Sequence, residues 1–245
     1  MQKLATVLTL LLLSVGFSHA QDVEVGLRGG PNYATFKGDT GAIEQPESTS
    51  AEYSRVFGAR FSGFLRFSMS ESFSVRTEVG YSQKGSALDV SRDGRTRDGQ
   101  FVRVDLDLGF RYDYLDVPIL AEYSFKTGSR FRPQVFAGPS IGFALNSNLD
   151  SDVTARVFNR FGQSQEIDPG NFDEPESPDI ETTDIGAVIG GGVSYVLGSG
   201  DSLFLDVRYN PSFTAFNSDD TSDTGQSVGL ENEAITVGVG YSFSL

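Results

Sequence analysis

The last twelve residues of the chain read Ala234-Ile-Thr-Val-Gly-Val-Gly-Tyr-Ser-Phe-Ser-Leu245. Every odd-numbered residue in this stretch is large and apolar, and every even-numbered residue is small or polar. Successive side chains of a β-strand point to opposite faces, so the stretch would have one hydrocarbon face and one polar face. A helix would scatter the apolar residues around its circumference. The pattern therefore predicts a strand that separates an apolar environment from a polar one.

The same alternation recurs along the chain and predicts about eight strands, an all-β fold. Most of these segments are 10 to 14 residues long, which suits the roughly 9–11 residues that a tilted strand needs to cross a bilayer. Eight is also the smallest even strand count in bacterial outer-membrane barrels. The expected strands are residues 23–36, 55–67, 73–82, 101–125, 133–145, 184–197, 203–213 and 234–245.

One predicted strand changes phase. Between Val102 and Tyr114 the apolar residues are even-numbered, whereas between Leu115 and Phe125 they are odd-numbered. A one-residue slip moves every later side chain to the other face, so a bulge or strand break is expected near Tyr114–Pro118. Pro118 has no amide hydrogen to donate to a neighbouring strand, which suits such a site.

The connections between the strands alternate in length. Segments 68–72, 126–132 and 198–202 are short, whereas 37–54, 83–100, 146–183 and 217–232 are long and polar. This is the arrangement of an antiparallel up-and-down transmembrane barrel with short periplasmic turns and long outer loops. The acidic loop 146–183 is expected to be extended and mobile. A role for it in binding divalent cations or a protein partner stays open.

The N-terminus has the features of an export signal. Residues 1–20 contain one basic residue, Lys3, then the apolar run Leu4–Phe17, and end in Ser18-His19-Ala20. The run is shorter than the roughly 20 residues that span a bilayer as a helix, so a cleaved signal peptide is predicted. Residues 21–245 are then expected to form a single barrel domain. Membrane residence would rely on its strands.

Composition excludes several classes of protein. The formal net charge of −14 argues against nucleic acid as a partner. The chain has no Cys, and its one His is His19, inside the predicted signal. Sites built on Ser-His, Cys-His or His-zinc are therefore impossible in the exported chain. We assign no catalytic, cofactor-binding or metal-binding residues, and we interpret Asp105/Asp107 and Asp219/Asp220 as solvated carboxylates.

The charged residues of the predicted polar faces would point into the lumen. They could form an ion-selective channel or a polar ligand site, or they could pair with one another and fill the barrel. Eight strands enclose little more than side chains, and unpaired buried charges are costly, so a salt-bridged plug is favoured. The residues expected inside are Arg60, Arg66, Arg76, Glu78, Arg103, Asp105, Asp107, Arg111, Asp113, Glu122, Asp206 and Arg208.

Aromatic residues gather near the predicted strand ends, where membrane barrels carry interfacial girdles. In a soluble protein the same residues would belong to a core. The expected girdle residues are Phe67, Phe73, Tyr81, Tyr112, Tyr123, Phe125, Tyr195, Tyr241 and Phe243.

Six segments along the chain carry a family resemblance through their order and spacing. They are Gly26-Leu-Arg-Gly-Gly-Pro-Asn-Tyr33, Tyr81-Ser-Gln-Lys-Gly85, Tyr114-Leu-Asp-Val-Pro-Ile-Leu120, Ala137-Gly-Pro-Ser-Ile-Gly142, Asp184-Ile-Gly-Ala-Val-Ile-Gly-Gly-Gly192 and Val237-Gly-Val-Gly-Tyr-Ser-Phe243. Together they resemble the PorT-like outer membrane β-barrel family, which is common in Bacteroidetes. The resemblance covers nearly the whole exported chain and implies an eight-stranded barrel, with one branch of the family tied to protein secretion.

We therefore expect a non-enzymatic protein in the outer membrane of a Gram-negative bacterium. Its role would be structural, adhesive or secretion-associated, carried by outer loops or periplasmic contacts. The expected partners are outer-membrane lipid and lipopolysaccharide, the barrel assembly machinery and a protein at the outer loops. The alternatives are a soluble lipocalin-like carrier, whose apolar faces would turn inward, and a narrow channel for small solutes.

Overall fold

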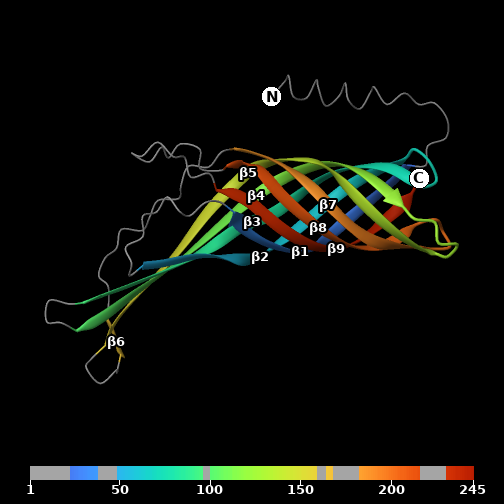
Figure 1. The fold of residues 1–245 in the computed structure, drawn as a ribbon. Helices are drawn as coiled ribbons and strands as arrows, with labels where there is room; N and C mark the ends of the chain where they lie inside the picture. The colour runs from blue at the N-terminus through green and yellow to red at the C-terminus, as the bar shows by residue number, and fades with distance from the viewer. Residues whose placement is uncertain (1–22, 38–48, 96–99, 159–163, 168–181, 216–229) are drawn as a thin grey trace.

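The structure, a computed structural model, describes residues 23–37, 49–95, 100–158, 164–167, 182–215 and 230–245 (Figure 1). The predicted signal peptide lies outside these residues. The described chain forms nine strands. They are β1 (Val23–Lys37), β2 (Thr49–Ser68), β3 (Phe73–Arg95), β4 (Phe101–Ser124), β5 (Phe131–Phe158), β6 (Ser164–Ile167), β7 (Thr183–Val196), β8 (Ser202–Ala215) and β9 (Glu231–Ser244).

Eight long antiparallel strands close into a ring, as predicted. They follow the order β4-β3-β2-β1-β9-β8-β7-β5, and pairing between β4 and β5 completes the circle. The four-residue strand β6 pairs only with the far end of β5. The turns that join β2 to β3, β4 to β5 and β7 to β8 are short and lie at the end of the barrel that holds the C-terminus (Figure 1). Among the described residues, no helical segment has the length and hydropathy to span a bilayer.

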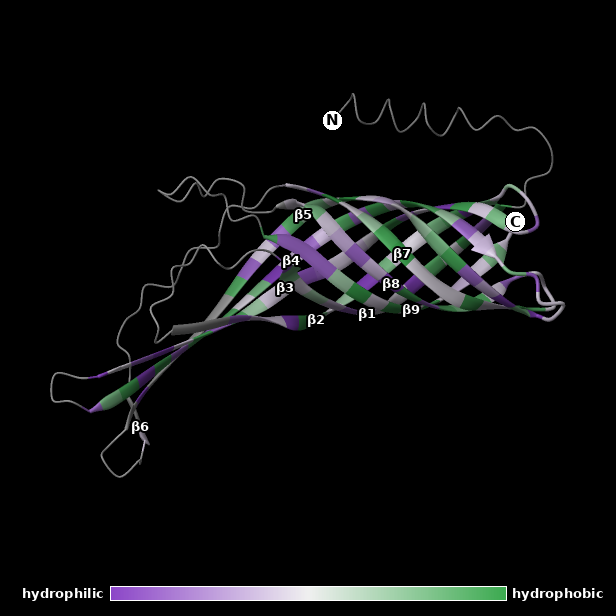
Figure 2. Cartoon of the chain, in the orientation of Figure 1, coloured by the Kyte–Doolittle hydropathy of each residue, from purple (hydrophilic) through white to green (hydrophobic). Residues whose placement is uncertain are grey.

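The two faces of the barrel wall have opposite character, which Figure 2 shows as an alternation of hydrophobic and hydrophilic residues along each strand. On the outside, Phe61 is 60% exposed and Val239 is 61% exposed. On the inside, Arg76 and Thr236 are completely buried. The apolar side chains thus face outward, opposite to the arrangement that a lipocalin-like carrier requires.

The predicted irregularity near Tyr114 exists, but it lies on the partner strand. Asp113 pairs with Asn146 and Tyr114 pairs with Ala144, so Leu145 of β5 is the extra residue of a bulge. The strand β4 itself keeps its phase, because even-numbered residues such as Tyr112 stay on its inward side. The hydropathy of the two faces of β4 reverses instead. From Asp113 back to Phe101, the outward side carries charged residues and the inward side carries apolar ones.

Four strands extend past the barrel, which corrects the predicted loops 37–54, 83–100 and 146–183. Beyond the level of Gly85, β3 pairs with the start of β2 on one side, from Thr49 to Arg55, and with β4 on the other, up to Arg95. At the same level β4 pairs with β5 up to Phe158. We call this region the outer sheet: residues 49–55 of β2, 85–95 of β3, 101–111 of β4 and 146–158 of β5. It projects from the end of the barrel opposite the C-terminus (Figure 1). The remainder of the predicted acidic loop, 168–181, lies outside the described residues.

We predict that Gly138→Ala will disrupt the barrel, whereas Gly63→Ala will not. A Cβ at Gly138 would overlap the backbone carbonyl of Ile119 on β4, which cannot move without breaking the strand pairing. A Cβ at Gly63 would lie 3.8 Å from the side chain of Leu27, an ordinary contact. The measurement is the fraction of protein that shows heat-modifiable gel migration after refolding into detergent. Equal folded fractions for the two variants would contradict the packing described here.

Candidate functional site

A buried network of ion pairs crosses the middle of the lumen. The Glu78 carboxylate accepts two hydrogen bonds from the Arg208 guanidinium, at 2.8 and 2.9 Å, and lies 3.1 Å from Nε of Arg76. Asp206 continues the network, at 3.1 Å from Arg208 and 2.5 Å from Arg28. All five side chains are inaccessible to solvent. Because β3 and β8 lie on opposite sides of the ring, the Glu78–Arg208 pair ties the barrel together across its interior.

A second tier lies toward the end with the short turns. Arg66 pairs with Glu24 at 2.9 Å and with Glu122 at 3.0 Å. Glu122 is also 3.3 Å from Arg76, which joins this tier to the central one. The contacts of Arg76 with Glu78 and Glu122 are ion pairs without hydrogen-bonding geometry.

A third tier lies toward the outer sheet. Asp116 pairs with Arg60 at 2.7 Å and with Lys84 at 3.3 Å. Lys84 also donates a hydrogen bond of 2.9 Å to Asp184, which accepts another from the Ser212 hydroxyl. This tier connects β2, β3, β4, β7 and β8.

The three tiers are balanced in charge. They contain six basic and six acidic side chains, each within ion-pairing distance of an opposite charge. A charge buried in a barrel without a partner would cost several kcal/mol. The arrangement therefore fills the lumen with a neutral network. The members are Glu24, Arg28, Arg60, Arg66, Arg76, Glu78, Lys84, Asp116, Glu122, Asp184, Asp206 and Arg208.

Aromatic rings occupy the space between the ion pairs. The guanidinium carbons of Arg76 and Arg208 lie 4.8 and 5.0 Å from the ring centre of Phe136. Phe64 and Phe204 meet edge to face, with ring centres 5.6 Å apart. Stacking on a ring is favourable for a guanidinium and leaves its edge free for carboxylates. The rings and ion pairs together pack the middle of the barrel.

A cluster of aromatic residues covers the network at the base of the outer sheet. Phe36, Tyr112 and Tyr114 are buried against one another, with Tyr53 and Phe110 packed alongside. The Lys84 ammonium lies 4.6 Å from the ring centre of Tyr114. Aromatic side chains are therefore packed on the outer side of the third tier of ion pairs.

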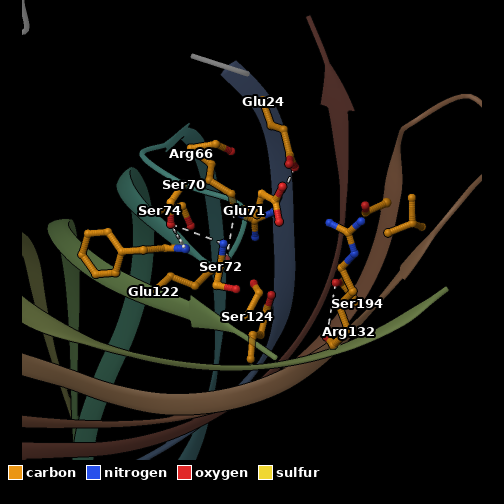
Figure 3. Close-up of a pocket in the computed structure, with 15 residues that line it drawn as sticks. Glu24, Arg66, Ser70, Glu71, Ser72, Ser74, Glu122, Ser124, Arg132 and Ser194 are labelled. Carbon is orange, nitrogen blue, oxygen red and sulfur yellow. Dashed lines mark hydrogen bonds and ion pairs between the residues drawn. The ribbon is translucent and has the colours of Figure 1, made fainter. Parts of the chain in front are cut away.

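At the other end, the lumen opens into a small polar recess of about 60 Å³ (Figure 3). Its charged lining residues are Glu24, Arg66, Glu71, Glu122 and Arg132. Behind the recess lies Arg76, which is completely buried. Water at this mouth can reach the second tier, while the buried central tier lies behind it. The recess is also lined by Ser68, Ser70, Ser72, Ser74, Ser124, Ser194 and Ser202.

Seven of the twelve charges predicted to face the lumen do so, and five do not. Arg103, Asp105, Asp107, Arg111 and Asp113 lie on the outward side of β4. The error has one cause: the phase assigned to β4 assumed a lipid-facing apolar side along the whole strand, but its first half lies in the outer sheet. The residues confirmed inside are Arg60, Arg66, Arg76, Glu78, Glu122, Asp206 and Arg208.

Sequence reasoning also missed five members of the network. Arg28 and Glu24 alternate with Val25 and Leu27 in β1, a signal that was available. Lys84 was assigned to the predicted loop 83–100, and Asp184 is the first residue of its predicted strand, where the alternation is too short to give a phase. Asp116 was on the polar side of its strand but was not counted as a lumen charge.

The predicted aromatic girdle is confirmed at the end with the short turns. Phe73, Tyr123, Phe125 and Phe243 are exposed on the outside of the barrel. Close ring pairs occur there between Tyr123 and Phe125, Phe131 and Tyr195, and Tyr241 and Phe243. Tyr112 was predicted to belong to the girdle but is buried in the aromatic cluster.

The outward side of the outer sheet carries charges that pair across strands. Arg103 donates hydrogen bonds of 2.7 and 3.0 Å to Asp93, which holds the pKa of Asp93 below its usual value. Arg156 lies 3.8 Å from Asp105, which accepts a hydrogen bond from Ser91. No group of acidic or His side chains among the described residues is arranged to hold a metal ion. The pair Asp219/Asp220 lies outside them.

We predict that Glu78→Gln will destabilise the barrel far more than Glu71→Gln. The first change leaves Arg76 and Arg208 without a shared counter-charge in the lumen and should cost about 3–5 kcal/mol. Glu71 pairs with Lys126 at an exposed turn, so its replacement should leave the unfolding midpoint nearly unchanged. Urea unfolding from lipid vesicles measures both. Equal shifts in the two unfolding midpoints would show that the central network is not important for stability.

Comparison with known proteins gives a family. Residues 19–217 match the family model for the outer membrane protein beta-barrel domain. No functionally curated protein matches the sequence. Similar solved structures include OprG from Pseudomonas aeruginosa, 12% identical, with a TM-score of 0.44 over 92% of this chain and 98% of that one.

Two further similar structures are outer-membrane or surface proteins. Neisserial surface protein A is 15% identical, with a TM-score of 0.41 over 89% of this chain and 97% of its own. Outer membrane protein W from E. coli is 17% identical, with a TM-score of 0.37 over 92% of this chain and 100% of its own. Together with the family model, which matches most of the chain, the closed ring of strands leads to one conclusion: the chain belongs to the outer membrane protein beta-barrel domain family.

Proposed function

We propose that this protein is a non-conducting outer-membrane scaffold that presents its outer sheet to the surroundings of the cell, in a structural or adhesive role. The closed lumen is the observation that carries the proposal. Ion pairs fill the middle of the barrel, and aromatic residues cover them on the outer side. A solute passing through would have to separate Glu78 from Arg208 and leave charges unpaired in the lumen.

The outer sheet supports the second half of the proposal. The described turns at the opposite end are tight, whereas β3, β4 and β5 continue well past the barrel and pair with one another. A rigid sheet held above the membrane offers a surface that a partner can contact. The barrel below would contact outer-membrane lipid and lipopolysaccharide through its apolar outside and aromatic girdle.

Within the family, motifs such as Tyr114-Leu-Asp-Val-Pro-Ile-Leu120 favour a place in the PorT-like branch. A secretion-linked role is the second candidate on that ground. It would depend on contacts at the periplasmic turns, whereas the structural or adhesive role depends on the outer sheet. Variants that alter only the periplasmic turns or only the outer sheet would distinguish the secretion-linked role from the structural or adhesive one.

We predict that the purified protein will show no stable conductance steps in planar lipid bilayers. The charged side chains of the central tier are inaccessible to solvent and paired with one another, so an ion would have to displace them to pass. A general porin inserted in the same bilayer is the positive control. Stable openings of the size that such a porin gives would refute the closed lumen and favour the channel alternative.

We also predict that the outer sheet can be removed without unfolding the barrel. Replacing residues 88–106 with a four-residue turn should leave heat-modifiable migration intact, because the barrel is paired independently below Gly85. Aggregation of cells that display the protein, followed by their settling in suspension, should decrease to the level of cells without it. The double variant Asp93→Ala/Arg103→Ala, which keeps the sheet, is the control. Unchanged settling after the deletion would argue against the adhesive role.

A further inference from the structure

Two buried donor groups line the polar recess at the end of the barrel with the short turns. Arg66 and Gln134 border the recess, and both side chains are more than nine-tenths buried. Among the residues that the structure describes, Nη2 of Arg66 and Nε2 of Gln134 have no hydrogen-bond partner. Both atoms can only donate. A buried donor without an acceptor is costly, so this lining favours a ligand that carries acceptor oxygens.

Serine hydroxyls surround the same space. Ser74, Ser194 and Ser202 border the recess and are buried, and they come from β3, β7 and β8. Figure 3 shows Ser74 and Ser194 on different strands around the recess. A hydroxyl can turn either to donate or to accept a hydrogen bond. The serines can therefore adapt to a ligand, whereas Arg66 and Gln134 require an acceptor.

One arginine at the recess carries a charge that no described side chain balances. The other charged residues of the lining belong to the neutral network or, in the case of Glu71, pair with Lys126 at the turn. Arg132 is exposed and forms no ion pair with a described residue. Because Gln134 is buried and Val135 is exposed on the outside, Arg132 lies on the inward side of β5. The lining thus has one surplus positive charge.

We infer that the recess binds a carboxylate group. Its oxygens would accept hydrogen bonds from Arg66 and Gln134, and its single negative charge would balance Arg132. Hydrogen bonds between a guanidinium and a carboxylate are short and roughly twice as strong as those between neutral groups. A phosphate carries up to about two negative charges, so Glu24 and Glu122 would repel it more strongly than they repel a carboxylate.

The size of the recess limits what else can enter. Its volume of about 60 Å³ corresponds to about four to six water molecules. A carboxylate with one or two carbon atoms fills that space, and the rest of a larger molecule would lie outside the mouth. A small free acid and the end of a peptide chain both present this group. The inference goes beyond the proposed function, because it concerns the end of the barrel opposite to the outer sheet.

Titration of the exported chain in phospholipid nanodiscs, followed by nuclear magnetic resonance, tests the site. Sodium acetate replaces sodium chloride at constant ionic strength, and the signal is the side-chain amide of Gln134, assigned by its loss in Gln134→Leu. We expect a saturable shift of this signal. A tripeptide with a free C-terminal carboxylate distinguishes the two sources. Binding at least as tight as that of acetate indicates a chain end, and binding of acetate alone indicates a small acid. The same peptide with a C-terminal amide should cause no shift.

Arg132→Gln and Arg130→Gln form a matched pair of variants. Both remove one positive charge from an exposed side chain at the same end of the barrel, but Arg132 lines the recess and Arg130 does not. Arg132→Gln should weaken acetate binding about tenfold, as expected for the loss of one interaction with a charged group. Arg130→Gln should leave the binding unchanged. Heat-modifiable migration of both variants checks that the barrel is folded.

Three results would overturn the inference: no saturable shift with acetate or the free peptide, equal weakening by the two variants, or tighter binding of inorganic phosphate than of acetate. The first would show that the recess holds water alone. The second would show that acetate responds to the overall charge of this end, and the third would assign the recess to another class of anion. None of them bears on the adhesive role, which the settling assay decides.

Discussion

An ionised side chain inside a narrow barrel loses most of its water and must find an opposite charge nearby. This constraint explains why Glu78 lies between Arg76 and Arg208, and why Asp206 lies between Arg208 and Arg28. Some of these contacts join strands that are not neighbours in the ring, such as Glu78 with Arg208. The partners come from β1, β3 and β8, so closure of the ring and pairing of the charges depend on each other.

The same network separates the two ends of the molecule. The end with the short turns has a small polar recess that stops at the buried central tier. At the other end Phe36, Tyr112 and Tyr114 pack together, and beyond them four strands leave the barrel as a sheet. In the proposed function, the barrel anchors this sheet above the membrane and passes no solute through its lumen.

Much of this fold could be predicted from alternation alone. The stretch 234–245 identified β9 and both of its faces, because lipid lies on one side of it along nearly its whole length. The strand β4 shows where this reasoning fails. Alternation tells which residues share a face, but which face is inward follows only if the surroundings are known. The prediction placed Tyr112 and Asp113 on the wrong faces. It assumed that lipid borders the whole length of β4, whereas the first half of this strand extends past the barrel.

The sequence predicted that ion pairs would fill the lumen, but it did not predict which residues pair with which. The alternation within single strands indicated that charges such as Arg76 and Glu78 point into the same interior. The cost of burying an unpaired charge then predicted that these charges would pair. The ion pair between Lys84 and Asp184 could not be predicted from the sequence. The two residues lie on β3 and β7, and whether they meet depends on how far each strand of the barrel is shifted along its neighbours. The strand extensions were missed because their polar residues, such as Asp89 and Asp93, were taken as signs of loops.

A double-mutant cycle between Glu78 and Arg208 tests the central claim most directly, with unfolding free energies measured in urea from lipid vesicles for Glu78→Gln, Arg208→Gln and the double variant. The account predicts a coupling energy of at least about 1.5 kcal/mol, as for desolvated charge pairs in close contact. The exposed pair Asp93–Arg103, measured in the same way, should couple far more weakly because water and salt screen it. A coupling for Glu78–Arg208 no larger than that of the exposed pair would contradict a lumen held together by buried ion pairs.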